Sequence, residues 1–150
     1  MEVHHSGGPP RSVSEIYQRT KNLSELYGKK ILDRCVPISE YVYGPLRGEA
    51  LVSKEILFEM IGNLSHEGWI LIYCRPSNKT LIEYAETQLE ESAKDKDHKP
   101  ANHTNMVKQS MQTIIDRYDY VIDVCRAKGM LVFIYDRDLQ LQGDLFPWTD

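Results

Sequence analysis

Residues 69–74, with the sequence WILIYC, form a continuous apolar run without alternation of polar and apolar positions. A second run of this kind, MLVFIYD, occupies residues 130–136. Short unbroken apolar runs are typical of strands that are buried on both faces, as in a parallel sheet. We therefore expect a fold that is built around parallel strands.

Amphipathic stretches separate these runs from two shorter apolar runs, one before His4 and one at residues 30–32. Apolar residues at helical spacing predict helices over residues 12–28, 50–64, about 79–92 and 106–128. Ser12 or Ser14 suits the first N-cap, and Gly28 suits its C-terminal cap. The predicted order is strand–helix–strand–helix–strand–helix–helix–strand. This order indicates one α/β domain over residues 1–150, with a mainly parallel sheet and helices on both faces.

The length, charge and composition of the chain exclude several classes of protein. A chain of 150 residues has the size of one ordinary domain. No apolar run approaches the roughly 20 residues of a membrane span, and MEVHHSGGPP at the start is unlike a signal peptide. The net charge of −4 gives no general attraction to nucleic acid. The three cysteines form no CxxC pair, so we expect no metal site and no disulfide framework, and a cytoplasmic location.

Ligands of parallel α/β sheets bind beyond the carboxyl ends of the strands, which directs attention to the segments that follow each predicted strand. The first is HHSGGPPRS, where Gly7 and Gly8 allow a ligand to approach the backbone and Arg11 stands near the next helix. It reads either as an anion- or substrate-binding turn or as a plain turn.

The second segment begins with Asp33 and Arg34, a charged pair that closes a predicted strand. An arginine suits a bidentate grip on phosphate, and an aspartate can accept a proton. Tyr41 and Tyr43 then offer flat faces for a base, and the glycines and proline up to Gly48 predict a loop. The alternative is an ion pair that ends the strand and tyrosines that cover the core.

Two further strand ends carry polar residues. Arg75 and Lys79 follow the third strand and either reach a phosphate or are solvated. Tyr135 and Asp136 follow the last strand and could line a nucleotide base. The polar segment 93–105 predicts an exposed, mobile loop, either a lid over phosphates or a solvated connection.

Taken together, these segments resemble a known family. ILDR at residues 31–34, followed by Ser39, Tyr43 and Gly44, resembles the Asp-Arg motif of thymidylate kinases and related deoxynucleoside monophosphate kinases. HHSGGPP stands where that family has a glycine-rich turn. LIYCRPSNKTL, RYDYVI and IYD resemble the branch found in bacteriophages. The resemblance covers about residues 3–138.

The resemblance implies a P-loop α/β fold and transfer of the γ-phosphoryl of ATP to a deoxynucleoside monophosphate, with Mg²⁺. It places Asp33 and Arg34 at the acceptor phosphate. It implies that the acceptor site is shaped by Gly7, Gly8, Arg11, Ser39, Tyr43 and Gly44, with Arg75 near the phosphates. The implied setting is the deoxynucleotide metabolism or DNA base modification of a bacteriophage, in the host cytoplasm.

One departure from the family is large. Residues 1–150 contain no G-x-x-x-x-G-K-[ST] motif, the loop that cradles the phosphates of ATP. The predicted first strand corresponds to the second strand of the family, whose first strand lies mid-sheet beside the strand that ends at Asp33. The predicted lid also lacks the expected arginines. Three explanations stay open: a fragment, a missing segment supplied by a second chain or by oligomerisation, or a non-catalytic protein that binds a nucleotide or another protein.

Overall fold

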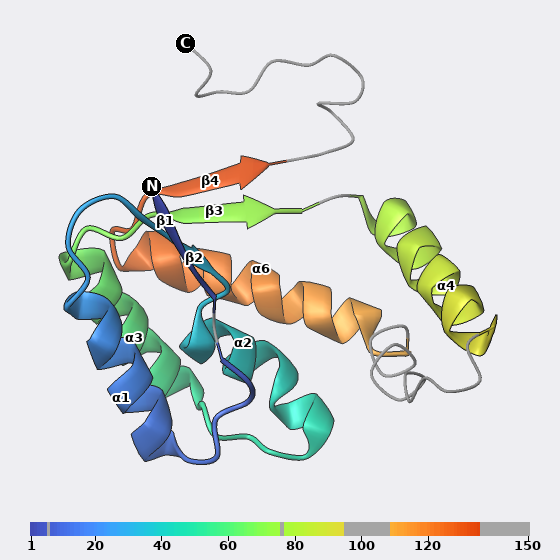
Figure 1. The fold of residues 1–150 in the computed structure, drawn as a ribbon, viewed down its shortest axis with the longest axis horizontal. Coiled ribbons are helices and arrows are strands. Elements are labelled where there is room, and N and C mark those ends of the chain that lie inside the picture. Colours follow the sequence, from blue (N-terminus) through green and yellow to red (C-terminus); the bar gives the residue numbers. More distant parts are fainter. Residues whose placement is uncertain (6, 76, 95–108, 136–150) are drawn as a thin grey trace, which may run out of the picture.

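The computed structural model describes residues 1–5, 7–75, 77–94 and 109–135 (Figure 1). The elements run in the order β1 (Glu2–His5), α1 (Val13–Ser24), β2 (Lys30–Asp33), α2 (Val36–Tyr43), the 3-10 helix η1 (Pro45–Arg47), α3 (Lys54–His66), β3 (Leu71–Cys74), α4 (Asn78–Lys94), α6 (Met111–Ala127) and β4 (Val132–Tyr135). Each predicted strand and helix has a counterpart, but α1 ends at Ser24 with Glu25 as its C-cap, so the predicted cap at Gly28 is wrong. Residues 106–108 of the last predicted helix lie outside the described residues. Ser12 is the N-cap of α1, and its Oγ accepts a hydrogen bond from the Glu15 amide at 3.1 Å.

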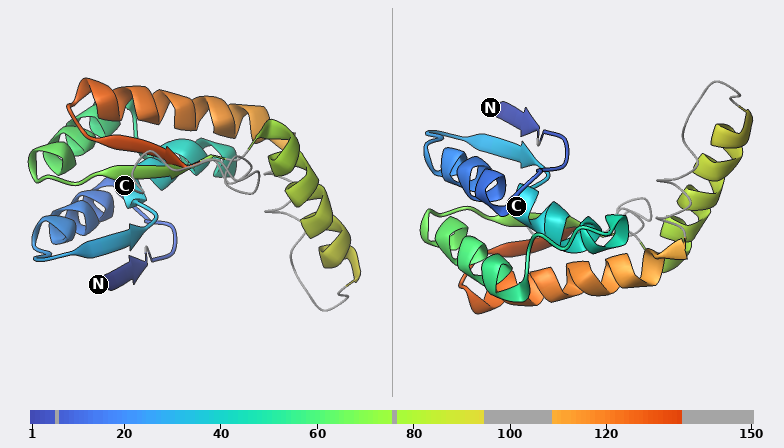
Figure 2. Two further views of the ribbon diagram at one scale, coloured as in Figure 1. Left: turned by 90° about the horizontal axis from the view of Figure 1, so that it is seen from above. Right: turned by 90° about the horizontal axis from the view of Figure 1, so that it is seen from below.

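The strands form two separate parallel pairs. β1 pairs with β2 so that Val3 lies beside Ile31, and β3 pairs with β4 so that Ile72 lies beside Phe133. The expected parallel pairing is confirmed, but the pairs do not join into one sheet among the described residues, and no P-loop fold is identified there. Seen from above and from below, the arrows lie in the order β1, β2, β3, β4 (Figure 2), whereas Figure 1 shows β1 and β2 running steeply across the direction of β3 and β4. We call the space between β2 and β3 the central interval.

The main helices lie on one side of the strands. Figures 1 and 2 show α1, α2, α3 and α6 beneath the two pairs, whereas α4 projects outward. The sequence predicted helices on both faces, and this is wrong for the part of the chain that the structure describes. Side-chain burial alternates along β2 and β3 as a consequence. Ile31 and Ile72 are exposed, whereas their neighbours along each strand are half-buried.

The core sits within the helical layer, and α2 is its centre. This helix contacts α1, α3 and α6. The largest side chains that are fully buried come from all four helices: Ile16, Val42, Leu57, Met60, Ile61, Val121 and Cys125. Leu71 of β3 and Val132 of β4 pack against this core, so burial of apolar surface between the helices supports the β3–β4 pair.

The helix α2 was not predicted, because the glycines and prolines around it indicated a loop. Pro37 occupies the first turn of α2, where a missing N–H costs nothing. Gly44 caps the end, and the following chain turns through η1 to Gly48, which has a φ of 82°. The loop prediction therefore fits only the segment after Tyr43.

A buried ion pair ties α2 to η1. The Glu40 side chain is 4% exposed, and its two oxygens accept hydrogen bonds from one nitrogen of Arg47 at 2.7 and 2.8 Å. A buried carboxylate is stable only while such a partner is present. The pair therefore fixes the turn that follows α2.

We expect Arg47→Ala to lower the free energy of unfolding by about 3 kcal/mol, because Glu40 keeps a buried charge without its partner. Urea denaturation measures this loss. Glu40→Gln combined with Arg47→Met should recover part of it. Arg126→Ala, at an exposed position of α6, is the control. An Arg47→Ala loss as small as the control's would contradict a structural role for the pair.

Candidate functional site

Two charged residues close β2 at its carboxyl end. The Asp33 carboxylate lies 2.9 Å from Nδ1 of His5, which ends the neighbouring strand β1, and both side chains are exposed. Because β1 and β2 are parallel, their ends meet at the same edge. Asp33 therefore stands at the predicted ligand edge and is accessible from solvent.

Arg34 has an unusual backbone. Its φ is 70°, and it is the one non-glycine residue with a positive φ among the described residues. A side chain in this left-handed conformation costs on the order of 1 kcal/mol. Such strain is common where a side chain is held for binding. The turn after β2 thus carries a backbone conformational cost at Arg34.

Three tyrosines meet next to this edge, and we call them the tyrosine cluster. They are Tyr43 from α2, Tyr73 from β3 and Tyr118 from α6. The rings of Tyr73 and Tyr118 stack with centroids 5.6 Å apart, and Tyr43 meets Tyr118 edge-on at 6.2 Å. Three segments that are distant in sequence therefore place aromatic faces side by side.

The pKa of Tyr73 is raised to about 12, mainly by burial and then by the nearby Asp119 carboxylate, while Arg75 opposes the rise. Burial is also the main cause of the raised pKa of Tyr118, followed by the Tyr43 hydroxyl, and the Arg34 guanidinium acts in the opposite direction. Both phenols thus stay protonated at neutral pH.

Arg75 lies at the other side of the tyrosine cluster, directly after β3. Its Nε donates to Asp119 at 3.3 Å, and its amide donates to the Tyr135 carbonyl of β4 at 2.9 Å. Its side chain is 29% exposed. Arg34 and Arg75 therefore each follow the carboxyl end of a strand, β2 and β3 respectively.

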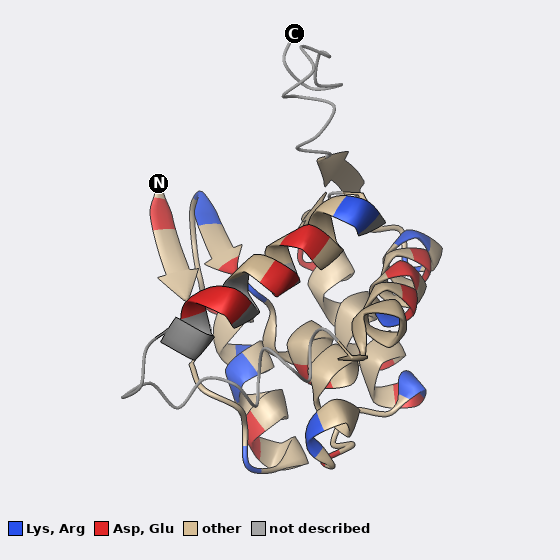
Figure 3. Ribbon diagram, turned by 90° about the vertical axis from the view of Figure 1, so that its right-hand side faces the viewer, with Lys and Arg blue, Asp and Glu red and all other residues tan. Residues whose placement is uncertain are grey.

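The helix that follows Arg75 is acidic. Figure 3 shows the red positions along α4, and the glutamates there are Glu83, Glu86, Glu90 and Glu91. Carboxylates repel phosphate, so α4 adds no anion-binding surface. The charge that suits an anion comes from the two arginines.

Other predicted site residues have structural roles or lie outside this cluster. The Arg11 amide donates to the Glu15 carboxylate at 2.7 Å, and the Gly8 carbonyl accepts from Arg19 at 2.6 Å, so the turn with Gly7 bonds into α1. Ser39 is half-buried on α2. The plain-turn interpretation of residues 4–11 fits these contacts.

Tyr41 belongs to the core instead of a base-binding face. It is 8% exposed, its ring lies 5.7 Å from that of Tyr120, and Arg117 lies over it at 5.6 Å. The alternative that a tyrosine covers the core is therefore confirmed for Tyr41. Tyr43, two positions later, is the one that reaches the cluster.

Two predictions fall on the C-terminal part of the described chain or beyond it. Tyr135 is half-buried at the end of β4, beside the amide of Arg75. Asp136 lies outside the described residues, as does the predicted lid 93–105 apart from its first two residues, which end α4. Sequence reasoning missed Tyr73, Tyr118 and Asp119, because apolar spacing indicated core positions for both tyrosines.

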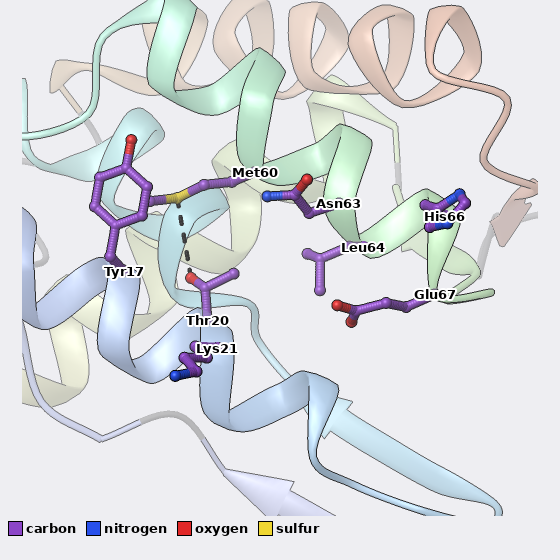
Figure 4. A pocket seen from close by; sticks show the side chains of 8 residues that line it. All are labelled: Tyr17, Thr20, Lys21, Met60, Asn63, Leu64, His66 and Glu67. Carbon is purple, nitrogen blue, oxygen red and sulfur yellow. Dashed lines mark hydrogen bonds between the residues drawn. The ribbon is translucent and has the colours of Figure 1, made fainter.

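A shallow pocket lies elsewhere, between α1 and α3. Its volume is about 220 Å³, and the residues that line it are Tyr17, Thr20, Lys21, Met60, Asn63, Leu64, His66 and Glu67 (Figure 4). Thr20 Oγ1 lies 3.9 Å from Met60 Sδ across it. It shares no residue with the tyrosine cluster, and none of its side chains is a predicted site residue.

Within the described residues, no three His, Cys, Asp or Glu side chains gather as metal ligands, and no helix is long and apolar enough to cross a membrane. No protein-family model, curated protein sequence or solved structure matched this chain.

Gly44 was predicted to shape the substrate site, but its surroundings give it a packing role. A Cβ at this position would lie 2.4 Å from the Glu49 carbonyl oxygen and 2.5 Å from that of Glu40. Real side chains do not approach backbone this closely, so the chain must shift to admit one.

We expect Gly44→Ala to lower the free energy of unfolding by about 2–3 kcal/mol, through overpacking against backbone. Gly8→Ala is the matched control, because a Cβ there meets nothing within 4 Å. Thermal or urea unfolding compares the two variants. Equal stabilities would refute the packing role of Gly44.

Proposed function

We propose that this chain is a thymidylate-kinase-like nucleotide-binding unit that holds a deoxynucleoside monophosphate as phosphoryl acceptor. The observation that supports the proposal is the placement of two arginines directly after strands, Arg34 after β2 and Arg75 after β3, where β3 also carries Tyr73 stacked on Tyr118. The proposal joins the resemblance of the ILDR segment to the tyrosine cluster, of which Tyr73 and Tyr118 were not part of that resemblance's predicted site.

The groups suit the two ends of a nucleotide. A guanidinium can bind a phosphate through two parallel hydrogen bonds. An aromatic ring with an accessible face can stack on a base, and the stacking is worth about 1–3 kcal/mol per base. Asp33, exposed beside Arg34, is a suitable acceptor for a substrate hydroxyl. Phosphoryl transfer relies on such positioning and charge neutralisation more than on covalent chemistry.

The donor side has no counterpart in the described residues. ATP and Mg²⁺ are implied by the resemblance, but residues 1–150 hold no glycine-rich phosphate loop, and no group of metal ligands is found where the structure describes the chain. The residues present do not fit either group, so we assign no step to ATP or Mg²⁺. The proposed contribution of this chain is the acceptor site.

Thermal-shift and calorimetric titrations with dTMP, dGMP, dCMP and dAMP test the acceptor site, with inorganic phosphate as a further probe. At least one nucleotide should bind more tightly than phosphate. Arg34→Ala should weaken that binding by about 10- to 100-fold, the cost of one charged hydrogen-bond partner. Arg126→Ala should leave it unchanged. If no monophosphate binds, or Arg34→Ala binds as the wild type does, the proposal is wrong.

A non-catalytic nucleotide-binding role is the second candidate, and the missing phosphate loop favours it. The two differ in transfer of labelled phosphate from Mg-ATP to the monophosphate that binds. Binding without transfer favours the non-catalytic role, and transfer that Arg34→Ala abolishes favours the kinase role.

A further inference from the structure

His5 is the last residue of β1, and Asp33 is the last residue of β2. The two are register partners in a parallel pair, so their side chains leave the strands on the same face. Nδ1 of His5 lies 2.9 Å from Oδ2 of Asp33. The function proposed above uses Asp33 and leaves the histidine beside it without a role.

The chemistry of this contact decides where the ring of His5 carries its proton. An ionised carboxylate can only accept hydrogen bonds, so Nδ1 of His5 is the donor to Asp33. A neutral imidazole has a single N–H, which is therefore on Nδ1 here, and Nε2 keeps a lone pair. The His5 side chain is 73% exposed, so a ligand can reach the ring from solvent.

A second charged pair closes β1 and β2 at their other end and provides an internal comparison. Glu2 and Lys30 are register partners there, and their side chains form an ion pair. Exposed ion pairs contribute little to stability, so neither pair is needed to hold the strands together. Ligands of open α/β sheets bind at the carboxyl edge. A binding role is therefore open to His5 and Asp33, but not to the pair at the amino edge.

The charged groups around His5 favour a protonated ring once an anion is present. Asp33 meets the ring from β2, the one strand that pairs with β1 in the described part of the chain. Arg34 follows Asp33 directly and brings a second cation to this strand end. His4 turns away, with its Nε2 3.3 Å from Glu2. A phosphate at Nε2 would give the ring of His5 an anion on each side.

We propose that His5 is a phosphate-binding residue of the acceptor site, and that its ring takes up a proton when a phosphate monoester dianion binds. Asp33 holds the Nδ1–H, and the new Nε2–H donates to a phosphate oxygen beside Arg34. The proton comes from solvent, and no covalent bond of the nucleotide forms or breaks. The proposal rests on the proposed function and deepens it by naming the residue that recognises the doubly charged phosphate.

The first measurement needs no ligand. Nitrogen-15 NMR of the histidine rings in the full chain, at pH 8, distinguishes Nδ1–H from Nε2–H. His5 should carry its proton on Nδ1, and Asp33→Ala should remove this preference. His66, an exposed histidine on α3, should be unaffected by Asp33→Ala. A His5 ring with its proton on Nε2 would overturn the proposal, whatever the chain binds.

The second measurement counts protons during binding. The monophosphate that binds, among dTMP, dGMP, dCMP and dAMP, is titrated by calorimetry at pH 8 in two buffers of different ionisation enthalpy. An ordinary imidazole is neutral at this pH, and the phosphate is already a dianion, so the wild type should take up about half a proton or more per nucleotide. His5→Gln, which keeps a donor but does not titrate, should take up almost none. His4→Gln is the matched control and should behave as the wild type does.

The pH dependence of affinity follows from this uptake. Binding that takes up a proton becomes tighter as the pH falls, so the wild-type affinity should rise about three- to tenfold between pH 8 and pH 6.5. In His5→Gln it should not rise, because the second pKa of a phosphate monoester is about 6 and the dianion becomes scarcer. The melting temperature of His5→Gln should stay within about 3 °C of the wild type, as for Glu2→Gln, since both pairs are exposed.

The possible results separate this proposal from the proposed function. Binding that requires Arg34 but takes up no proton, or an uptake that persists in His5→Gln, would overturn the role of His5 and leave the acceptor site intact. Unchanged affinity of His5→Gln at pH 6.5 would do the same and assign to His5 and Asp33 only the closing of the strand pair. If none of the four monophosphates binds, the acceptor site and the role of His5 are both overturned.

Discussion

Backbone hydrogen bonding at the strand edges is the constraint on which the rest of this structure depends. A buried N–H or C=O without a partner costs as much as a lost hydrogen bond, so edges must be paired, covered or exposed to water. In the described chain, β2 and β3 each have one strand partner and one open edge. The exposed side chains of Ile31 and Ile72 lie on these two strands.

The helical layer is what allows two separate strand pairs to exist at all. A two-stranded unit is marginal in water and needs another element to pack against. The layer provides this support through α2, whose Val42 is fully buried and whose Glu40 bonds to Arg47 at the following turn. It also brings Tyr43 to Tyr118, so the same packing that fixes the strands assembles the tyrosine cluster.

The sequence predicted the parts of the fold that local patterns determine. The runs at 69–74 and 130–136 became paired parallel strands, and Ser12 capped α1, because unbroken apolar runs and cap residues act over a few positions. The helix α2 escaped prediction because Gly44 and Pro45 are loop signals, although both follow its end. The joining of strands into one sheet depends on contacts between distant segments, which no local pattern reports.

The candidate site divides in the same way. Asp33, Arg34 and Arg75 were placed at strand ends by the rule that ligands bind beyond the carboxyl ends of parallel strands. Tyr73 and Tyr118 are in contact although they lie 118 − 73 = 45 positions apart in the sequence. Their apolar neighbours in the sequence predicted core positions for both. Gly44 was predicted from the motif as a site residue, but the structure gives it a packing role. The nearby Glu49 carbonyl leaves no room for a side chain at this position.

Amide hydrogen exchange of the 150-residue chain, followed by NMR, tests the open edge of β3 most directly. Leu71, Tyr73 and Arg75 point to β4, so their amides should exchange slowly. Those of Ile72 and Cys74 point into the central interval and should exchange at least tenfold faster, since water is their partner. Equal protection of all five amides in a monomer would show that another part of the chain already bonds this edge, and would contradict the account.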